Sequence, residues 1–190
     1  MDATRQYAPT LFGIAPDHVK RYQFAASAIS AGLRVLDAAC GCGYGSRVLS
    51  DSRLAVAGVD INQDAIEWAR KYFPGPNYIL GDVTELDLDA DVLVTFETLE
   101  HLKEPEKLLT GVSAKGLFAS VPNEEVYPFD AKKFGGDEYP HQRHYTPAQF
   151  DDLLASCGWN VKKRFCQMDK SGAITPGTDG MFLLYVAKHD

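Results

Sequence analysis

Short apolar runs alternate with segments of helical periodicity along this chain, an arrangement typical of a parallel sheet with crossover helices. The apolar runs that predict buried strands are residues 35–39, 55–60, 77–80, 92–96 and 116–121. The segments that predict helices are residues 17–31, 46–52, 63–73 and 147–157, with one more beginning at Pro105. Because strands this apolar need cover on both faces, we expect an α/β fold built on a doubly wound sheet.

The C-terminal part of the chain predicts two further strands, at residues 159–167 and 181–189. A Gly- and Thr-rich loop separates them, so we expect them to form an antiparallel pair at the edge of the sheet. The predicted sheet therefore has seven strands and is mostly parallel. Thr146 and Gln149 form a capping box around Pro147, which predicts the start of the last helix.

The composition supports one globular domain. The chain has 190 residues, of which 45% are hydrophobic and 24% charged, close to globular averages and unlike a disordered or fibrous chain. We expect a single domain over 1–190, with 1–32 as an N-terminal cap helix region. The formal charge of −7 disfavours nucleic acid as a partner.

Four cysteines are too few for a disulfide scaffold. The start of the chain has no pattern of a secretory signal, and no apolar stretch is long enough to span a membrane. We therefore expect a soluble, cytoplasmic protein with no membrane partner, either a monomer or a homodimer.

The segment VLDAACGCGYGS, residues 35–46, combines a buried strand, a glycine-rich turn and the start of a helix. Glycines allow a tight turn and a close approach of the backbone to a ligand. The helix N-terminus beyond offers free N–H groups, and ligands of open α/β sheets lie at the carboxyl ends of the strands. A tight structural turn with no ligand remains the alternative.

Asp60 ends the second predicted strand, 60 − 41 = 19 residues after Gly41. An acidic residue at about this distance can accept hydrogen bonds from both ribose hydroxyls of a nucleoside. The glycines follow the spacing G-x-G-x-G, with Ser46 where a dinucleotide site prefers its third glycine. The turn and Asp60 together predict a nucleoside pocket, and the spacing disfavours a nicotinamide dinucleotide.

At this point the sequence resembles the class I S-adenosylmethionine-dependent methyltransferases. VLDAACGCGYG is similar to the first motif of that family, GVDIN to the second and GDV (81–83) to the third. FETLEHL (96–102) resembles the fourth-strand segment, and the resemblance spans roughly residues 5–187. It implies a Rossmann-like fold, methyl transfer as the reaction and S-adenosyl-L-methionine as the cofactor.

The resemblance also implies a set of cofactor-binding residues. They are Arg21, Asp37, Ala39, Gly41, Gly43, Asp60, Ile61, Asp82, Val83, Glu97 and Thr98. By this likeness Asp60 would hold the ribose hydroxyls and Ile61 would pack on the adenine. Asp82 would accept from the adenine amino group, and the backbone N–H of Val83 would face the ring. Gly41 would pass under the methionine and ribose parts, together with Gly43.

Three of these residues have further implied roles. Asp37 would orient the turn or meet the cofactor's ammonium group through water, and Arg21 would pair with its carboxylate. Glu97, with the residues up to Leu99, would line the methionine end. Ala39 stands where many members carry glycine, and we expect its methyl group to need slightly more room but no forbidden backbone angle.

The long segment 122–145, rich in Pro, Gly, Tyr and His, is the predicted acceptor site. The candidate catalytic residues are His144, His141, Arg143 and Tyr145. A histidine titrates near neutral pH and can take a hydroxyl proton, and Arg143 can hold a carboxylate or phosphate. An equally good alternative is that these side chains cap the following helix and pack on Tyr139. His101 is either a further base or, more simply, a structural residue.

The acceptor is expected to be a small molecule, aromatic or anionic, with oxygen as the favoured methyl acceptor. Rings and positive charges in the segment support this expectation: Tyr127, Phe129, Phe134, Tyr139, Lys132 and Lys133. No C-x-x-C or H-E-x-x-H pattern is present, so we predict no metal. Two alternatives stay open: a nicotinamide-dependent oxidoreductase, and a non-catalytic S-adenosylmethionine-binding module.

Overall fold

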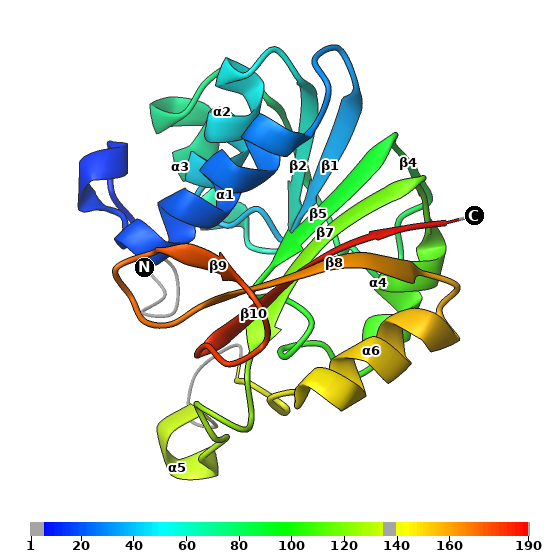
Figure 1. Cartoon of the computed structure of the whole chain (residues 1–190). Helices are drawn as coiled ribbons and strands as arrows, with labels where there is room; N and C mark the ends of the chain where they lie inside the picture. Colours follow the sequence, from blue (N-terminus) through cyan, green and yellow to red (C-terminus); the bar gives the residue numbers. More distant parts are fainter. Residues whose placement is uncertain (1–5, 135–139, 190) are drawn as a thin grey trace.

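An eight-stranded sheet forms the centre of the computed structural model, which describes residues 6–134 and 140–189 (Figure 1). Its strand order is β3-β2-β1-β5-β7-β10-β8-β9. The strands are β1 Arg34–Ala38, β2 Ala55–Asp60, β3 Asn77–Leu80, β5 Val92–Phe96, β7 Gly116–Pro122, β8 Asn160–Gln167, β9 Ile174–Pro176 and β10 Phe182–Lys188. The five strands from β3 to β7 are parallel, and β10, β8 and β9 run antiparallel to their neighbours.

Strand β1 is the point at which the winding of the sheet reverses. It pairs with β2 on one side and with β5 on the other, both in parallel. The chain therefore leaves the carboxyl ends of β1 and β5 toward opposite sides of the sheet. In doubly wound folds this reversal opens a crevice at the carboxyl ends of the strands, where ligands bind.

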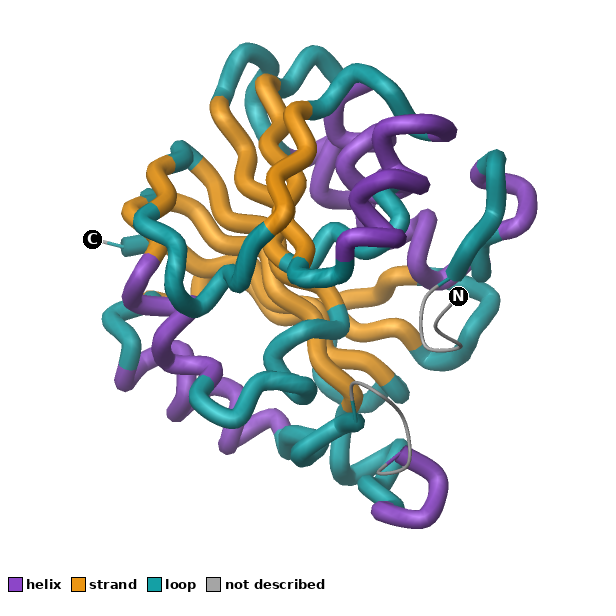
Figure 2. The backbone as a smooth tube through the Cα atoms, turned by 180° about the vertical axis from the view of Figure 1, so that it is seen from behind, coloured by secondary structure: helices purple, strands orange, loops and turns teal. Residues whose placement is uncertain are grey.

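Helices cover both faces of the sheet (Figures 1 and 2). On one side lie α1 Pro16–Ala28, α2 Tyr44–Asp51 and α3 Gln63–Tyr72, and on the other lie α4 Pro105–Gly111 and α6 Pro147–Ser156. A 3-10 turn, Leu11–Gly13, and a short helix, α5 Ala131–Phe134, complete the described helical segments. Each face has its own apolar core, with Leu49 and Ala25 in one and Leu108, Phe150 and Trp159 in the other.

The Rossmann-like, mostly parallel fold expected from the sequence is confirmed, with one strand more than predicted. The extra strand is β9, which lies in the loop that the sequence marks as Gly- and Thr-rich. A separate two-stranded sheet joins β4 Leu88–Asp89 to β6 Val112–Ser113. Both additions are too short to give an apolar pattern of their own.

The antiparallel pairing of the last two long strands at one end of the sheet is also confirmed, with the short extra strand β9 added outside them. Strand β10 inserts between β7 and β8, so it pairs on both sides and lies inside the sheet. Its first four residues, 182–185, are all buried. A strand buried on both faces is stabilised in the interior, which leaves β8 and the short β9 outside it.

The capping box at the start of α6 is present as predicted. The Thr146 side chain accepts from the Gln149 backbone N–H at 3.2 Å, and the Gln149 side chain accepts from the Thr146 N–H at 2.9 Å. We expect Thr146→Ala to lower the free energy of unfolding by about 1 kcal/mol, because the N3 donor loses its partner. Urea denaturation measures this change.

Thr110→Ala is the matched control. The Thr110 hydroxyl donates to the Glu106 carbonyl inside α4, an exposed bond that adds little to helix stability. An equal loss in both variants would contradict the capping role of Thr146.

All four cysteines are free and buried, as expected for a chain without a disulfide scaffold. Within residues 6–134 and 140–189, no helix has both the length and the apolar character needed to cross a bilayer.

Candidate functional site

A cavity of about 250 Å³ lies at the carboxyl ends of the parallel strands, beside the reversal at β1. The turn after β1, the end of β2 and the segment after β5 all contribute to its wall. The predicted cofactor-binding residues that line it are Ala39, Gly41, Asp60, Ile61, Asp82, Val83, Glu97 and Thr98. The tertiary structure thus brings together side chains from four separate segments at the place where the fold class expects a ligand.

Gly41 and Asp60 connect the turn after β1 to the end of β2. The Asp60 carboxylate accepts from the Gly41 N–H at 2.8 Å and from the Asn62 N–H at 2.9 Å. Gly41 has a φ of +53°, and a Cβ placed on it would meet no atom within 4 Å. The missing side chain of Gly41 therefore leaves open space beside a buried carboxylate.

Ala39 adopts a left-handed conformation, with a φ of +58°. This angle lies in the small allowed left-handed region, so it is not forbidden to alanine, although few residues other than glycine adopt it. The backbone must reverse directly after β1 so that Gly41 can reach Asp60, and this conformation costs an L-residue about 1–2 kcal/mol. Glu97, at the corresponding position after β5, is also left-handed, with a φ of +52°. Residues in such conformations cluster at ligand-binding sites.

Gly43 serves packing, since it does not line the cavity. A Cβ on Gly43 would lie 2.5 Å from the Ala69 Cβ and 2.8 Å from the Tyr78 hydroxyl. A Cβ on Gly45 would lie 2.1 Å from the Tyr22 ring. The glycine-rich turn thus combines one position that opens the cavity with two that let helices approach it.

Asp37 is fully buried and does not line the cavity. Its carboxyl accepts from the Tyr22 hydroxyl at 3.0 Å and from the Ser46 hydroxyl at 2.6 Å. Burial raises the pKa of Asp37 to about 7, against the opposing effect of these two hydrogen bonds. Of the two roles implied for Asp37, the geometry supports the orientation of the turn.

Arg21 is fully buried next to the cavity wall. Its guanidinium donates to Gln167 at 2.6 Å and to Asp17 at 3.1 Å, and it lies 4.5 Å from the centre of the Phe182 ring. Its Nη1 lies 3.7 Å from Glu97 Oε1 and makes no hydrogen bond within the described structure. Arg21 therefore reaches the methionine end of the predicted site only through Glu97.

Ile61 and Asp82 lie at the opposite end of the cavity from Glu97 in the predicted arrangement. Ile61 is 51% exposed, which is unusual for a large apolar side chain and leaves a surface available for packing. The Asp82 carboxylate accepts from the N–H and the hydroxyl of Thr84, both at 2.8 Å. These two bonds hold the Asp82 side chain in a defined direction.

None of the four predicted catalytic residues lines the cavity. Arg143 is half-buried and donates to the Lys103 carbonyl at 3.1 Å, while the buried Tyr145 donates to the Leu99 carbonyl at 3.3 Å. The buried His144 lies between the Tyr127 carbonyl at 2.6 Å and the His141 ring nitrogen at 2.8 Å. The structure thus gives Arg143, His144 and Tyr145 contacts that anchor the segment 140–145.

The aromatic residues of the same segment pack on one another. Tyr127, Phe129 and Phe134 all contact the His144 ring, with centroids 4.9–5.6 Å apart. Their faces are therefore largely occupied within this cluster. Tyr139 lies outside the described residues.

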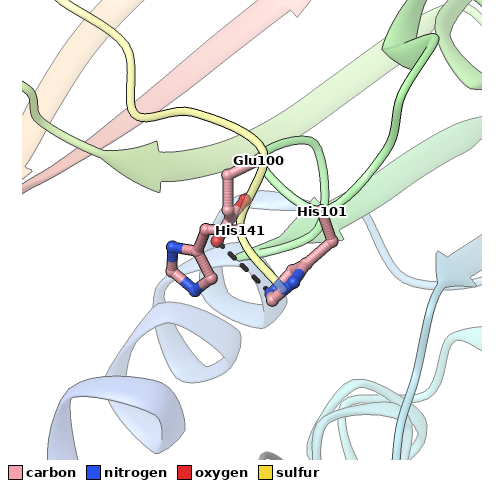
Figure 3. Close-up of side chains that lie close together, drawn as sticks. All are labelled: Glu100, His101 and His141. Atoms are coloured by element: carbon pink, nitrogen blue, oxygen red, sulfur yellow. Dashed lines mark ion pairs between the residues drawn. The ribbon is translucent and has the colours of Figure 1, made fainter. Parts of the chain in front are cut away.

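The sequence analysis named His101 and His141 separately but did not predict that they meet at Glu100. Glu100, His101 and His141 place ligand-capable atoms within 4.8 Å of one another, and His101 also lines the cavity (Figure 3). His101 Nε2 lies 3.9 Å from Glu100 Oε1. The only local signal was the neighbouring Glu–His pair in FETLEHL, because His141 comes from a distant segment.

The cavity also contains residues of the N-terminal region that the sequence did not single out. They are Gln6, His18, Tyr22 and Tyr44. The ring of His18 is hydrogen-bonded to the Tyr44 hydroxyl at 3.0 Å, and burial lowers the pKa of His18 to about 3. Helix α1 and the start of α2 thus close the cavity from above the sheet.

Comparison with known proteins agrees with this fold. Residues 36–114 match a family model described as a methyltransferase domain. A probable S-adenosylmethionine-dependent methyltransferase of Mycolicibacterium smegmatis is 28% identical over 144 residues, which cover 70% of this chain and 54% of that protein. A ubiquinone biosynthesis O-methyltransferase of Coxiella burnetii is 31% identical over 90 residues, 44% of this chain and 38% of that protein. The chain therefore spans about half, or less, of the length of these relatives.

A solved structure from Thermotoga maritima shows the same architecture. It is an S-adenosylmethionine-dependent methyltransferase, described as a possible histamine N-methyltransferase. It superposes with a TM-score of 0.73 over 92% of this chain and 90% of that chain, at 17% identity, and so speaks for the fold. Together with the glycine-rich turn and the acidic end of β2, the matched domain and the similar proteins support a class I S-adenosylmethionine-dependent methyltransferase.

Proposed function

We propose that this chain transfers a methyl group from S-adenosylmethionine to a small-molecule acceptor, at an oxygen atom. One observation carries the proposal: Gly41, Asp60, Ile61, Asp82 and Glu97 line a single cavity at the carboxyl ends of β1, β2 and β5. The open space over Gly41 and the buried Asp60 carboxylate fit the ribose part of this cofactor. When bound, the cofactor supplies a methyl group activated by its sulfonium.

The proposed contacts follow from the chemistry of the lining residues. Asp60 would exchange its bonds to backbone N–H groups for bonds to the ribose hydroxyls, and Ile61 would cover one face of the adenine. Asp82, already oriented by Thr84, would accept from the adenine amino group. Glu97 and the neighbouring Thr98 would border the methionine end.

Arg21 and Val83 have supporting roles in this proposal. Arg21 would fix the direction of the Glu97 carboxylate from behind the cavity wall, at 3.7 Å. The backbone N–H of Val83, whose side chain is buried, would meet the adenine ring. Asp37 and Gly43 would act on the cofactor only through the shape of the turn.

Oxygen is favoured as the acceptor atom by the name of one relative and by the chemistry beside the cavity. The Coxiella burnetii relative is described as an O-methyltransferase of ubiquinone biosynthesis. His101, which lines the cavity, is an imidazole able to interact with an acceptor hydroxyl. Methyl transfer otherwise depends mainly on holding donor and acceptor in a near-attack geometry.

Isothermal titration calorimetry with S-adenosylhomocysteine and with NADH tests the cofactor. We expect binding of the first ligand and no binding of NADH. The opposite result would support a nicotinamide-dependent oxidoreductase and overturn the proposal. A product assay for S-adenosylhomocysteine across a panel of phenols, hydroxy acids and amines then tests the acceptor. Binding without turnover on every class would favour a non-catalytic module.

Replacement of Asp60 gives the sharpest mutational test of the cavity. We expect Asp60→Ala to weaken S-adenosylhomocysteine binding by more than about tenfold, because each hydrogen bond to an ionised carboxylate is worth ~1.5–3 kcal/mol. Calorimetric titration measures the change, with circular dichroism to verify the fold.

Asp64→Ala provides a control with the same change of charge. Asp64 is exposed in the first turn of α3 and does not line the cavity. Unchanged affinity is expected there. A folded Asp60→Ala variant with undiminished affinity would remove Asp60 from the proposed site.

A further inference from the structure

A carboxyl group and two imidazoles meet at the border of the cavity (Figure 3). Glu100 and His101 lie in the turn after β5, and His141 lies in the segment that leads to α6. One ligand-capable atom from each lies within 4.8 Å of the others. Since His101 also lines the cavity, the cluster has access to the space where an acceptor would lie.

The carboxyl group of Glu100 has no hydrogen-bond partner within the described part of the chain. The residue is fully buried, and neither Oε1 nor Oε2 makes a hydrogen bond. Nearly all buried polar groups in native proteins have a hydrogen-bond partner. Two buried carboxyl oxygens without a hydrogen bond, one of them 3.9 Å from the His101 Nε2, therefore indicate a missing ligand.

Hydrogen bonds fix which nitrogen of His141 carries a lone pair. The Tyr127 carbonyl can only accept, so the His144 Nδ1 at 2.6 Å from it carries the proton. With its proton on Nδ1, the neutral His144 ring accepts a hydrogen bond at Nε2. His141 Nδ1, 2.8 Å away, must be the donor of that bond. The lone pair of His141 is therefore on Nε2, the arrangement found in metal-ligating histidines.

Hydrogen bonds join the two segments that form the cluster. The Gln142 N–H donates to the Glu100 carbonyl at 2.7 Å. The bonds from Arg143 to the Lys103 carbonyl and from Tyr145 to the Leu99 carbonyl attach the same segment on either side of it. The cluster is thus a built site, with both of its segments fixed before any ligand binds.

We propose that Glu100, His101 and His141 bind a divalent first-row transition-metal cation such as Zn²⁺, Mn²⁺ or Co²⁺. Imidazole nitrogens together with one carboxylate suit these cations better than Ca²⁺ or Mg²⁺, which prefer oxygen ligands throughout. The sequence-based argument against a metal considered local motifs, and these ligands come from two separate segments. Three protein ligands leave coordination positions for water or for an acceptor oxygen, and this last role rests on the proposed methyl transfer.

Titration with Co²⁺ tests the site without reference to catalysis. The chain is freed of metal with a chelator, titrated with Co²⁺ alone and followed by visible absorption, with the bound metal measured by elemental analysis. We expect a single equivalent to bind with a d–d absorption band, and Zn²⁺ to displace it. Glu100→Gln and His141→Asn should each weaken Co²⁺ binding by about tenfold or more.

His189→Asn is the matched control, because His189 lies at the far end of the sheet, where its N–H donates to the Lys115 carbonyl. Its Co²⁺ affinity should equal that of the parent chain. Calorimetry with S-adenosylhomocysteine, in parallel, separates this proposal from the proposed function, because neither Glu100 nor His141 lines the cavity. Absence of stoichiometric Co²⁺ binding, or equal binding by the parent chain and both folded variants, overturns the metal site whatever the calorimetry shows.

Discussion

Asp37→Asn is expected to stabilise the protein relative to the parent chain by up to about 4 kcal/mol more at pH 8 than at pH 4. Burial raises the pKa of Asp37 from 3.8 to about 7 in the folded protein. The folded state therefore holds this proton more tightly than the unfolded state. The stability that the protonated carboxyl contributes is complete below pH 3.8 and is lost as the pH rises to about 7. An asparagine has no proton to lose.

The asparagine amide also suits the surroundings of Asp37. Its oxygen can accept from the Tyr22 hydroxyl and its nitrogen can donate to the Ser46 oxygen, so both contacts can be kept. Urea denaturation of both chains at several pH values gives the difference in unfolding free energy. We expect this difference to grow between about pH 4 and pH 7 and to level off above.

Asp87→Asn removes the same charge at an exposed position and should give no such trend. If the unfolding free energies of the parent chain and of Asp37→Asn changed with pH in parallel, ionisation of Asp37 would not destabilise the folded state. That result would contradict the reading of Asp37 as a buried, protonated link between β1, α1 and α2.

Gly43→Ala is expected to lower the free energy of unfolding by about 3 kcal/mol, the combined cost of a left-handed alanine and of overpacking. Gly43 has a φ of +83°, and its Cβ would lie 2.5 Å from the Ala69 Cβ. Gly41→Ala should cost only about 1 kcal/mol, since its Cβ meets no atom within 4 Å. Chemical denaturation measures both.

The effect on S-adenosylhomocysteine affinity should have the opposite order, with the larger loss in Gly41→Ala and the smaller loss in Gly43→Ala. A methyl group on Gly41 occupies cavity space, so we expect about tenfold weaker binding or more, whereas a folded Gly43→Ala variant should bind nearly as the parent chain does. Gly111→Ala is the control: it lies at the end of α4, with nothing near its Cβ and no left-handed φ. Equal loss of affinity at Gly41 and Gly43 would contradict the division of roles within the turn.

Local patterns were sufficient for most of the fold. The apolar run 92–96 coincides with β5, and the capping box at Thr146 marks the start of α6, because burial on both faces and satisfaction of the first helical N–H groups are local requirements. The position of β10 inside the sheet was not predicted. Strand order beyond sequential neighbours depends on which strand buries more apolar surface, and that is decided by partners distant in the chain.

In the cofactor part of the candidate site, too, some features follow from the local sequence and others depend on residues distant in the chain. Asp60 ends a predicted strand, and Gly41 and Asp82 each follow one by two residues, so a parallel sheet brings them to one edge, and all three line the cavity. The left-handed φ of Ala39 was not predicted, because an alanine in a sequence does not indicate a positive φ in the way that a glycine does. It is imposed by the distance that the turn must cover to reach Asp60.

By itself the sequence determined the class of sheet, the resemblance to class I methyltransferases and the segments that meet at the carboxyl ends of the strands, since all three depend on periodicity and short motifs. Only the tertiary structure decided what the segment 140–145 does. It turns His144 away from the cavity toward the Tyr127 carbonyl and brings His141 against Glu100 and His101. The physical reason is that a long loop is fixed by hydrogen bonds to residues far from it in sequence, such as the bond from Gln142 to the Glu100 carbonyl, which no local pattern encodes.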